Sequence, residues 1–212
     1  MKKIAILVSI LMIMMVSIAE AKGSKNHQRK EDKKFEKIMK DFQMEAVMKT
    51  TKGDITFFLY PEAAPKNVAN FVFLAKNDFY NGLKFFRVVP NGLVQGGDPA
   101  ENGTGTTGYI IPDEKKKWLN FDVEGILAMS NSGPNTNSSQ FFITMQAMKE
   151  LNGKYTIIGG IKSRDDLSIL RTLRENDKIL NIDIKGKKID KFLDYFPDEV
   201  SEWESKLKYL HP

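Results

Sequence analysis

The sequence predicts a mainly β fold, in which a closed antiparallel β-barrel is capped by two α-helices and followed by a short helical extension. Short runs rich in Val, Ile, Phe and Thr alternate with turn residues such as Pro-Asn-Gly, which is typical of several short antiparallel strands. Within the strand-rich region, apolar residues recur at helical spacing in residues 65–76 and 165–173. Strands that close into a barrel with a helix over each end account for both observations.

The first 21 residues are typical of a secretory signal peptide. Lys2 and Lys3 precede a largely apolar run at 4–18, and Ala19-Glu20-Ala21 fits a cleavage site after Ala21. The run is shorter than the roughly 20 residues that span a bilayer. We therefore expect a periplasmic or secreted protein, and the alternative is an uncleaved N-terminal anchor, which would be its only attachment to a membrane.

Residues 22–44 predict a basic linker that ends in a short amphipathic helix. This segment has a net charge of +4, whereas residues 45–212 hold 22 charges of each sign. Phosphate binding requires a basic face on the folded domain, so we expect no nucleic-acid partner. The helix acts either as a simple tether or as a contact for a partner.

The predicted barrel elements follow in chain order. Residues 45–60 form a hairpin that turns at Lys52-Gly53-Asp54, and Pro65 opens the first helix, since proline is well tolerated in the first turn. The remaining elements are strands within 83–98 and 127–145, a strand at 156–158, a helix at 165–173 and a closing strand at 179–184.

Residues 188–212 predict two short amphipathic helices separated at Pro197. Apolar residues recur at helical spacing on both sides of this proline, which interrupts a helix. We expect the helices to dock on the barrel through Phe192, Phe196 and Trp203 in a monomeric protein. The alternative is that they form a dimer or partner contact.

Composition excludes several classes of enzyme. The chain has no cysteine, which removes disulfides, thiolate nucleophiles and cysteine-based zinc sites. Its two histidines, His27 and His211, lie outside the strand-rich region, so a Ser-His-Asp hydrolase or a histidine-ligated metal site is not expected. We predict that the protein uses no metal and no cofactor.

Two segments combine strand patterning with polar side chains that a pure core would exclude. They are KFFRVVPNGLVQGGD at 84–98 and LAMSNSGPNTNSSQFFIT at 127–144. Arg87 stands two residues from Phe85, and Gln95 stands between Val94 and a glycine pair, where packing alone would select aliphatic residues. This mixture indicates a shallow apolar pocket with a few directed hydrogen-bond donors.

Both segments closely resemble the signature regions of cyclophilin-type peptidyl-prolyl cis-trans isomerases, and the similarity extends from about residue 45 to 184. The resemblance implies a cyclophilin-like domain at 45–187 with eight strands and two capping helices. It also implies an enzyme that rotates X-Pro bonds in proline-containing polypeptides, here during the folding of exported proteins.

Such an enzyme needs no covalent chemistry. Rotation about an X-Pro bond faces a barrier of roughly 18 to 20 kcal/mol, because the nitrogen lone pair is delocalised into the carbonyl. Acceleration into the millisecond range requires only about 6 to 7 kcal/mol. A dry slot for the proline ring, a donor that favours a localised lone pair and a grip on the flanking backbone are sufficient.

The resemblance assigns these roles residue by residue. Arg87 supplies the donor, and Gln95 holds its guanidinium or the substrate carbonyl. The expected substrate-binding residues are Leu93, Asn131, Gln140, Phe142, Leu151 and Tyr155.

The chain departs from the family pattern at three positions. Gly92 stands where an aromatic residue usually floors the proline slot, Tyr155 replaces a frequent histidine, and Glu150 occupies the position of a tryptophan that cyclosporin contacts. We expect weak cyclosporin binding. Because Gly92 leaves the slot incomplete, the alternative function is a peptide-binding or chaperone module with little isomerase activity.

Overall fold

The computed structural model describes residues 28–210, and the chain divides into two units, residues 1–39 and 40–212. In the first unit the described residues 28–39 are helical, and the helix continues to residue 40. The predicted signal peptide and the start of the linker lie outside the described residues. Within 28–210, no helix is both long enough and apolar enough to cross a bilayer.

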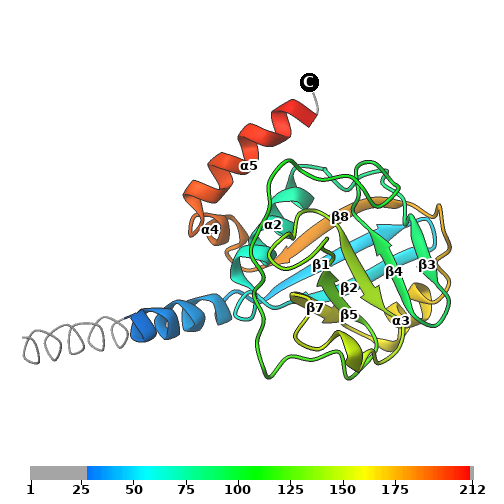
Figure 1. Cartoon of the computed structure of the whole chain (residues 1–212), viewed down its shortest axis with the longest axis horizontal. Helices are drawn as coiled ribbons and strands as arrows, with labels where there is room; N and C mark the ends of the chain where they lie inside the picture. The colour runs from blue at the N-terminus through cyan, green and yellow to red at the C-terminus, as the bar shows by residue number, and fades with distance from the viewer. Residues whose placement is uncertain (1–27, 211–212) are drawn as a thin grey trace, which may run out of the picture. The chain divides into compact units, whose positions relative to one another are not determined.

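The second unit is built on one antiparallel sheet of eight strands in the order β3-β4-β6-β5-β7-β2-β1-β8 (Figure 1). The strands are β1 (Met44–Thr50), β2 (Gly53–Leu59), β3 (Arg87–Val89), β4 (Leu93–Gly96), β5 (Ile126–Met129), β6 (Phe141–Thr144), β7 (Ile157–Ile161) and β8 (Ile179–Gly186). The mainly β prediction and the number of strands are confirmed.

The sheet is a curled half-barrel, so the expectation of a fully closed barrel was too strong. Its two outer strands are β3 and β8. Within residues 28–210 the two edges are joined only where residues 82–85 meet 176–179, through an isolated bridge between Lys84 and Lys178 and a few backbone hydrogen bonds. Strand β3 has three residues, since Pro90 follows it at once in a turn and lacks the N–H that a ladder needs. A strand this short cannot pair along the length of β8.

The β1–β2 hairpin shows how the sequence builds this sheet. In β2, Ile55, Phe57 and Leu59 alternate with more exposed residues and point into the core. The turn lies at residues 51 and 52, just before the predicted position, and it is held by Thr50 Oγ1, which donates to the carbonyl of Gly53 at 2.7 Å. Helix α2 (Pro65–Lys76) contacts β8 and buries Phe71 and Val72.

Glu114 completes the N-terminal end of α2, where no local side chain provides a cap. The carboxylate accepts the backbone N–H groups of Lys66 at 3.2 Å and Asn67 at 2.9 Å, which would otherwise have no helical partner. Burial raises the pKa of Glu114, although these N–H donors oppose the shift. A loop residue 47 positions away thus fixes the start of the helix.

Helix α3 (Arg164–Leu170) ends three residues before the predicted end at Leu173. The backbone N–H groups of Thr172 and Leu173 bond to carbonyls three residues back, so the chain continues as a tight turn instead of an α-helix. Leu173 still reaches the core, where it is fully buried. A short 3₁₀-helix, η1 (Lys149–Leu151), precedes β7.

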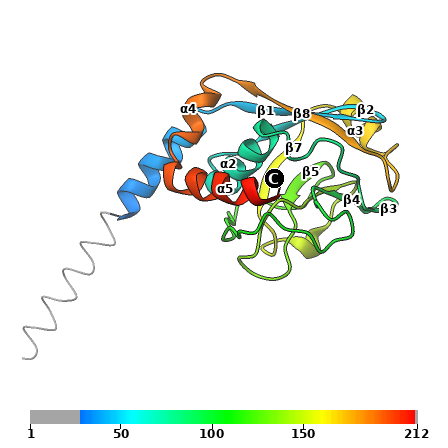
Figure 2. The same ribbon diagram turned by 90° about the horizontal axis from the view of Figure 1, so that it is seen from above.

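The C-terminal extension folds as two helices, α4 (Ile189–Leu193) and α5 (Pro197–Leu210). The three predicted docking residues Phe192, Phe196 and Trp203 are at most 4% exposed. Phe42, which precedes β1 in the sequence, packs against Phe192 with ring centroids 5.2 Å apart. Helix α5 lies alongside α2 (Figure 2), so the prediction that the extension docks on the barrel is confirmed.

Candidate active site

A single row of side chains crosses five strands of the sheet. The strand register pairs Arg87 with Gln95, Gln95 with Phe142, Phe142 with Ala128, and Ala128 with Ile157. Residues directly opposite each other in antiparallel strands project from the same face. The row therefore changes along the sheet from a cation, through an amide, to apolar side chains.

Gln95 joins the polar members of this row. Its Oε1 accepts a hydrogen bond from Nη1 of Arg87 at 3.3 Å, while its Nε2 donates to Ser130 Oγ at 2.9 Å and to Gln140 Oε1 at 3.2 Å. Both amide hydrogens are thus engaged by protein groups. Of the two roles expected for Gln95, this geometry favours holding the guanidinium over binding a substrate carbonyl.

Gln140 is oriented in turn by the loop that follows β4. Its Nε2 donates to the carbonyls of Gly103 at 3.2 Å and Gly105 at 3.0 Å. The loop is folded around the fully buried carboxylate of Asp98, which accepts backbone N–H groups from three residues. These donors are Ala100, Asn102 and Gly103, at 2.9, 3.0 and 2.5 Å.

An apolar cluster surrounds Phe142, which is 4% exposed. Phe121 stacks on its ring at 5.8 Å between centroids, and Tyr155 meets it edge-on at 5.2 Å. Leu93 and Leu151 pack against the cluster and are partly exposed, as is Tyr155. These three side chains provide an apolar surface beside Gln95, because Gln95 and Phe142 are cross-strand neighbours.

A polar cavity of about 480 Å³ adjoins the same residues. Gln95, Gln140 and Asn131 line it, together with the glycine and threonine loop at 103–106. Asn131 is held by its neighbours, since its Nδ2 donates to Asn137 Oδ1 and its Oδ1 accepts the N–H of Gly133, both at 3.3 Å. Gln95 thus belongs both to the cavity wall and to the row that leads to the apolar cluster.

All eight residues predicted for the site lie in these two adjoining areas. The polar area contains Arg87, Gln95, Asn131 and Gln140, and the apolar area contains Leu93, Phe142, Leu151 and Tyr155. The sequence did not identify Ser130, Phe121 or Met148, which contact these residues. Phe121 and Met148 come from irregular segments, and no local pattern links them to Phe142.

The turn between β3 and β4 contains Gly92, which is buried and provides no side chain to the apolar area. Gly92 donates its N–H to the carbonyl of Val89 at 2.9 Å, and Asn91 between them has a φ of 55°. A β-carbon placed on Gly92 would lie 2.9 Å from Val89 Cγ1. Glu150, at the position where cyclosporin would meet a tryptophan, is exposed in η1.

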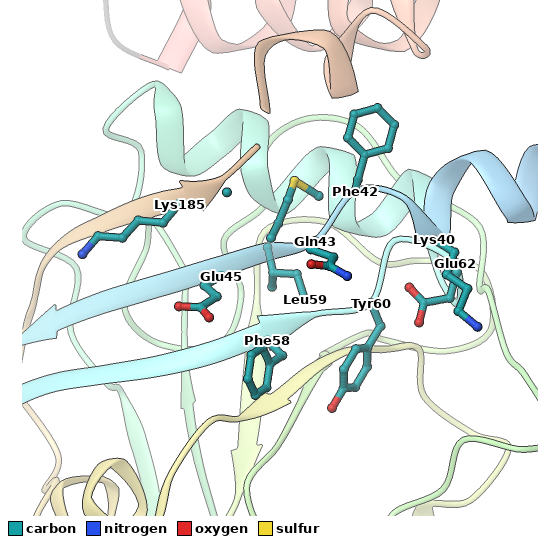
Figure 3. Close-up of a pocket in the computed structure, with 11 residues that line it drawn as sticks. Lys40, Phe42, Gln43, Glu45, Phe58, Leu59, Tyr60, Glu62 and Lys185 are labelled. Atoms are coloured by element: carbon teal, nitrogen blue, oxygen red, sulfur yellow. The ribbon is translucent and has the colours of Figure 1, made fainter. Parts of the chain in front are cut away.

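A larger cavity of about 710 Å³ opens elsewhere, at the start of β1 and the end of β2 (Figure 3). Phe42, Phe58 and Tyr60 line it with Glu45 and Glu62. It contains none of the predicted site residues. Within residues 28–210, no group of three or more His, Asp or Glu side chains is arranged to hold a metal ion.

Comparison with known proteins gives a consistent result. Residues 44–189 match the family model described as cyclophilin type peptidyl-prolyl cis-trans isomerase. A protein from Synechococcus elongatus named peptidyl-prolyl cis-trans isomerase is 41% identical over 140 residues, covering 66% of this chain and 95% of its own length. One from Helicobacter pylori is 39% identical over 137 residues, covering 65% and 84%.

Solved structures of a Cryptosporidium parvum cyclophilin type isomerase have the same fold. One is 33% identical, with a TM-score of 0.62, and the match covers 68% of this chain and 98% of that chain. A second, described as solved in the presence of the dipeptide Ala-Pro, is 32% identical, also with a TM-score of 0.62, covering 66% and 98%.

We predict that Gly105→Ala disrupts the loop that orients Gln140. The new β-carbon would come within 1.9 Å of Asp98 Oδ1 and 2.7 Å of the Ala100 nitrogen, so the Asp98 carboxylate cannot keep its position. The free energy of unfolding should fall by about 2 kcal/mol, as for other overpacked sites. Urea unfolding measures this loss.

Thr104→Ala is the control in the same loop, because the Thr104 side chain is exposed and bonds only locally to Asn102 among the described residues. It should change the free energy of unfolding by less than about 0.5 kcal/mol. Equal stability of the two variants would show that Asp98 does not organise the loop.

Proposed function

Since this chain belongs to the cyclophilin-type peptidyl-prolyl cis-trans isomerase family and is an enzyme of that class, we propose that it accelerates X-Pro rotation in exported proteins through Arg87 and without covalent chemistry. The observation that carries this proposal is the row in which Arg87, Gln95 and Phe142 are cross-strand neighbours. It brings a permanent cation next to an apolar surface.

Arg87 acts on the imide nitrogen of the substrate. As the X-Pro bond twists, the nitrogen lone pair leaves conjugation and becomes a hydrogen-bond acceptor. A guanidinium is always charged and offers a rigid fork of N–H groups, so it stabilises this localised pair. Among residues 28–210 the fork bonds only to Gln95 and is exposed, which leaves its other N–H groups available to the substrate.

The apolar area receives the proline ring. Leu93, Leu151 and Tyr155 are the partly exposed side chains around Phe142, and a ring seated against them excludes water from the twisted imide. The Cryptosporidium parvum structure solved in the presence of Ala-Pro supports a ligand of this chemistry for the fold.

The polar cavity receives residues that precede proline in the substrate. Gln95 lines the cavity and is the cross-strand neighbour of Phe142, so a peptide whose ring contacts Phe142 can extend its chain into it. Asn131 lies on the cavity wall and can bind the main chain of an extended peptide. Fixing one side of the imide in this way lets the other side rotate.

A peptide-binding or chaperone module with little isomerase activity is the second candidate. Gly92 favours it, because the chain has no aromatic ring at the position that floors the slot in the family pattern. A slot of this kind holds the ring less firmly while the polar grip remains.

We predict that Arg87→Ala lowers kcat/KM for a short Ala-Pro peptide by about 100-fold, the usual loss when a transition-state donor is removed. A protease that cleaves only the trans conformer provides the assay. Arg87→Lys should retain part of the activity, because it keeps the charge but loses the fork. Arg164→Ala, which removes another exposed arginine on α3, is the control.

Two results would contradict this mechanism. Full activity of Arg87→Ala would show that the guanidinium takes no part in the reaction. A wild-type rate near background, unchanged by the substitution, would instead favour the binding module.

We predict that Gly92→Phe raises kcat/KM for the same peptide about fivefold, since an added aromatic contact contributes about 1 kcal/mol. Gly92→Ala is the matched control, because it introduces the same β-carbon crowding against Val89 without a ring. The alanine variant should lose stability without gaining activity. A folded Gly92→Phe protein that is no more active than Gly92→Ala would show that the missing aromatic ring does not limit catalysis.

Export rests on the pattern of the first 21 residues. We predict that the protein recovered from the periplasm or the medium begins at Lys22 and that its intact mass lacks residues 1–21. Detection of the full-length mass in the membrane fraction would indicate an uncleaved anchor.

A further inference from the structure

The C-terminal helices lie outside the family match, which ends at residue 189, yet they are packed into the domain. Trp203 of α5 is 2% exposed. It contacts Phe73 of α2 at 5.5 Å between ring centroids and stacks on Tyr109 at 5.8 Å with an interplanar angle of 20°. Helix α5 therefore contacts the loop that follows β4 as well as the adjacent helix.

Further contacts place α5 along the same loop. Glu199 pairs with Lys66 of α2 at 2.6 Å, which fixes the first turn of α5. A β-carbon added at Gly108 would lie 3.9 Å from Lys206 Cδ, so Lys206 passes beside the backbone of that loop. Helix α5 thus lies beside two consecutive residues of the loop, Gly108 and Tyr109.

Hydrogen bonds connect Tyr109 to the wall of the cavity. The buried Tyr109 hydroxyl donates to Asn70 Oδ1 at 2.7 Å, and Asn70 Nδ2 donates to the carbonyl of Ser138 at 2.7 Å. Ser138 Oγ accepts the N–H of Thr107 at 3.1 Å. Ser138 lines the cavity, so the stack with Trp203 is two hydrogen bonds away from its surface.

The loop between β4 and β5 contains no strand. Besides its hydrogen bonds to Gln140 and Ser138, two further points hold its cavity wall. One is the Asp98 carboxylate, which fixes residues 100–103. The other is Tyr109, between Thr106 and Ile110 of the cavity lining. Asp98 and its partners all lie within the matched family region, whereas Tyr109 stacks on Trp203, which lies beyond it.

We propose that α5 determines substrate specificity, with Trp203 and Tyr109 as positioning residues that set the shape of the polar cavity. This inference rests on the proposed role of the cavity in binding residues that precede proline. Neither side chain is assigned a contact with the reacting imide. Their loss should change the recognition of extended substrates and leave the chemical step intact.

The test compares two peptides with wild-type protein and with Trp203→Ala. One is a short peptide with only Ala before proline, and the other is extended by several polar residues at its N-terminus, which suit the amide and hydroxyl groups of the cavity. We expect Trp203→Ala to raise KM for the extended peptide about fivefold with kcat little changed, because the altered wall weakens binding. The short peptide should change less than about twofold.

Phe192→Ala is the matched control. Phe192 is another fully buried aromatic residue of the extension, but it packs against Phe42 and Phe196 rather than the cavity loop. It should destabilise the protein without altering the ratio between the two peptides. Trp203→Phe should restore most of the wild-type ratio, because a ring can still stack on Tyr109.

Tyr109→Phe keeps the proposal testable if Trp203→Ala does not fold. It removes only the bond to Asn70 and should shift KM for the extended peptide in the same direction by a smaller factor. Equal losses on both peptides, or the same change of ratio in Phe192→Ala, would overturn the proposal. Failure of the proposed function is distinguishable, because the wild-type protein would then isomerise neither peptide above background.

Discussion

The site depends on a directed series of hydrogen bonds that begins at two backbone carbonyls. Gly103 and Gly105 accept from Gln140, so the oxygen of Gln140 must face Gln95, and the oxygen of Gln95 must then face Arg87. An amide has distinct donor and acceptor ends, so reversing either glutamine would leave like groups facing each other. The carbonyls thereby set the orientation of a guanidinium on another strand.

This arrangement explains why the loop after β4 is folded around a buried carboxylate. Asp98 gathers three N–H groups and so turns the carbonyls of the loop toward Gln140. A charge buried without such donors would be costly. The orientation of Arg87 and the stability of the loop are therefore coupled through the same few residues.

Much of the site could be predicted because its residues occupy short strands with a readable pattern. Arg87, Gln95 and Phe142 lie in two distinctive segments, and the strand register then makes them neighbours. Phe121 and Ser130 were not predicted, because they reach the site through loop geometry that no periodicity describes. The sequence also predicted a closed barrel where the structure has a curled half-barrel. Closure depends on how far β3 extends before Pro90.

The first and last parts of the domain are structural neighbours. Strand β1 pairs with β8 over its whole length, and Phe42 packs against Phe192. The N-terminal end of a chain leaves the ribosome first. Strand β1 is therefore synthesised long before β8, its outer partner. During synthesis, β1 therefore remains without a neighbour on the side that β8 later covers.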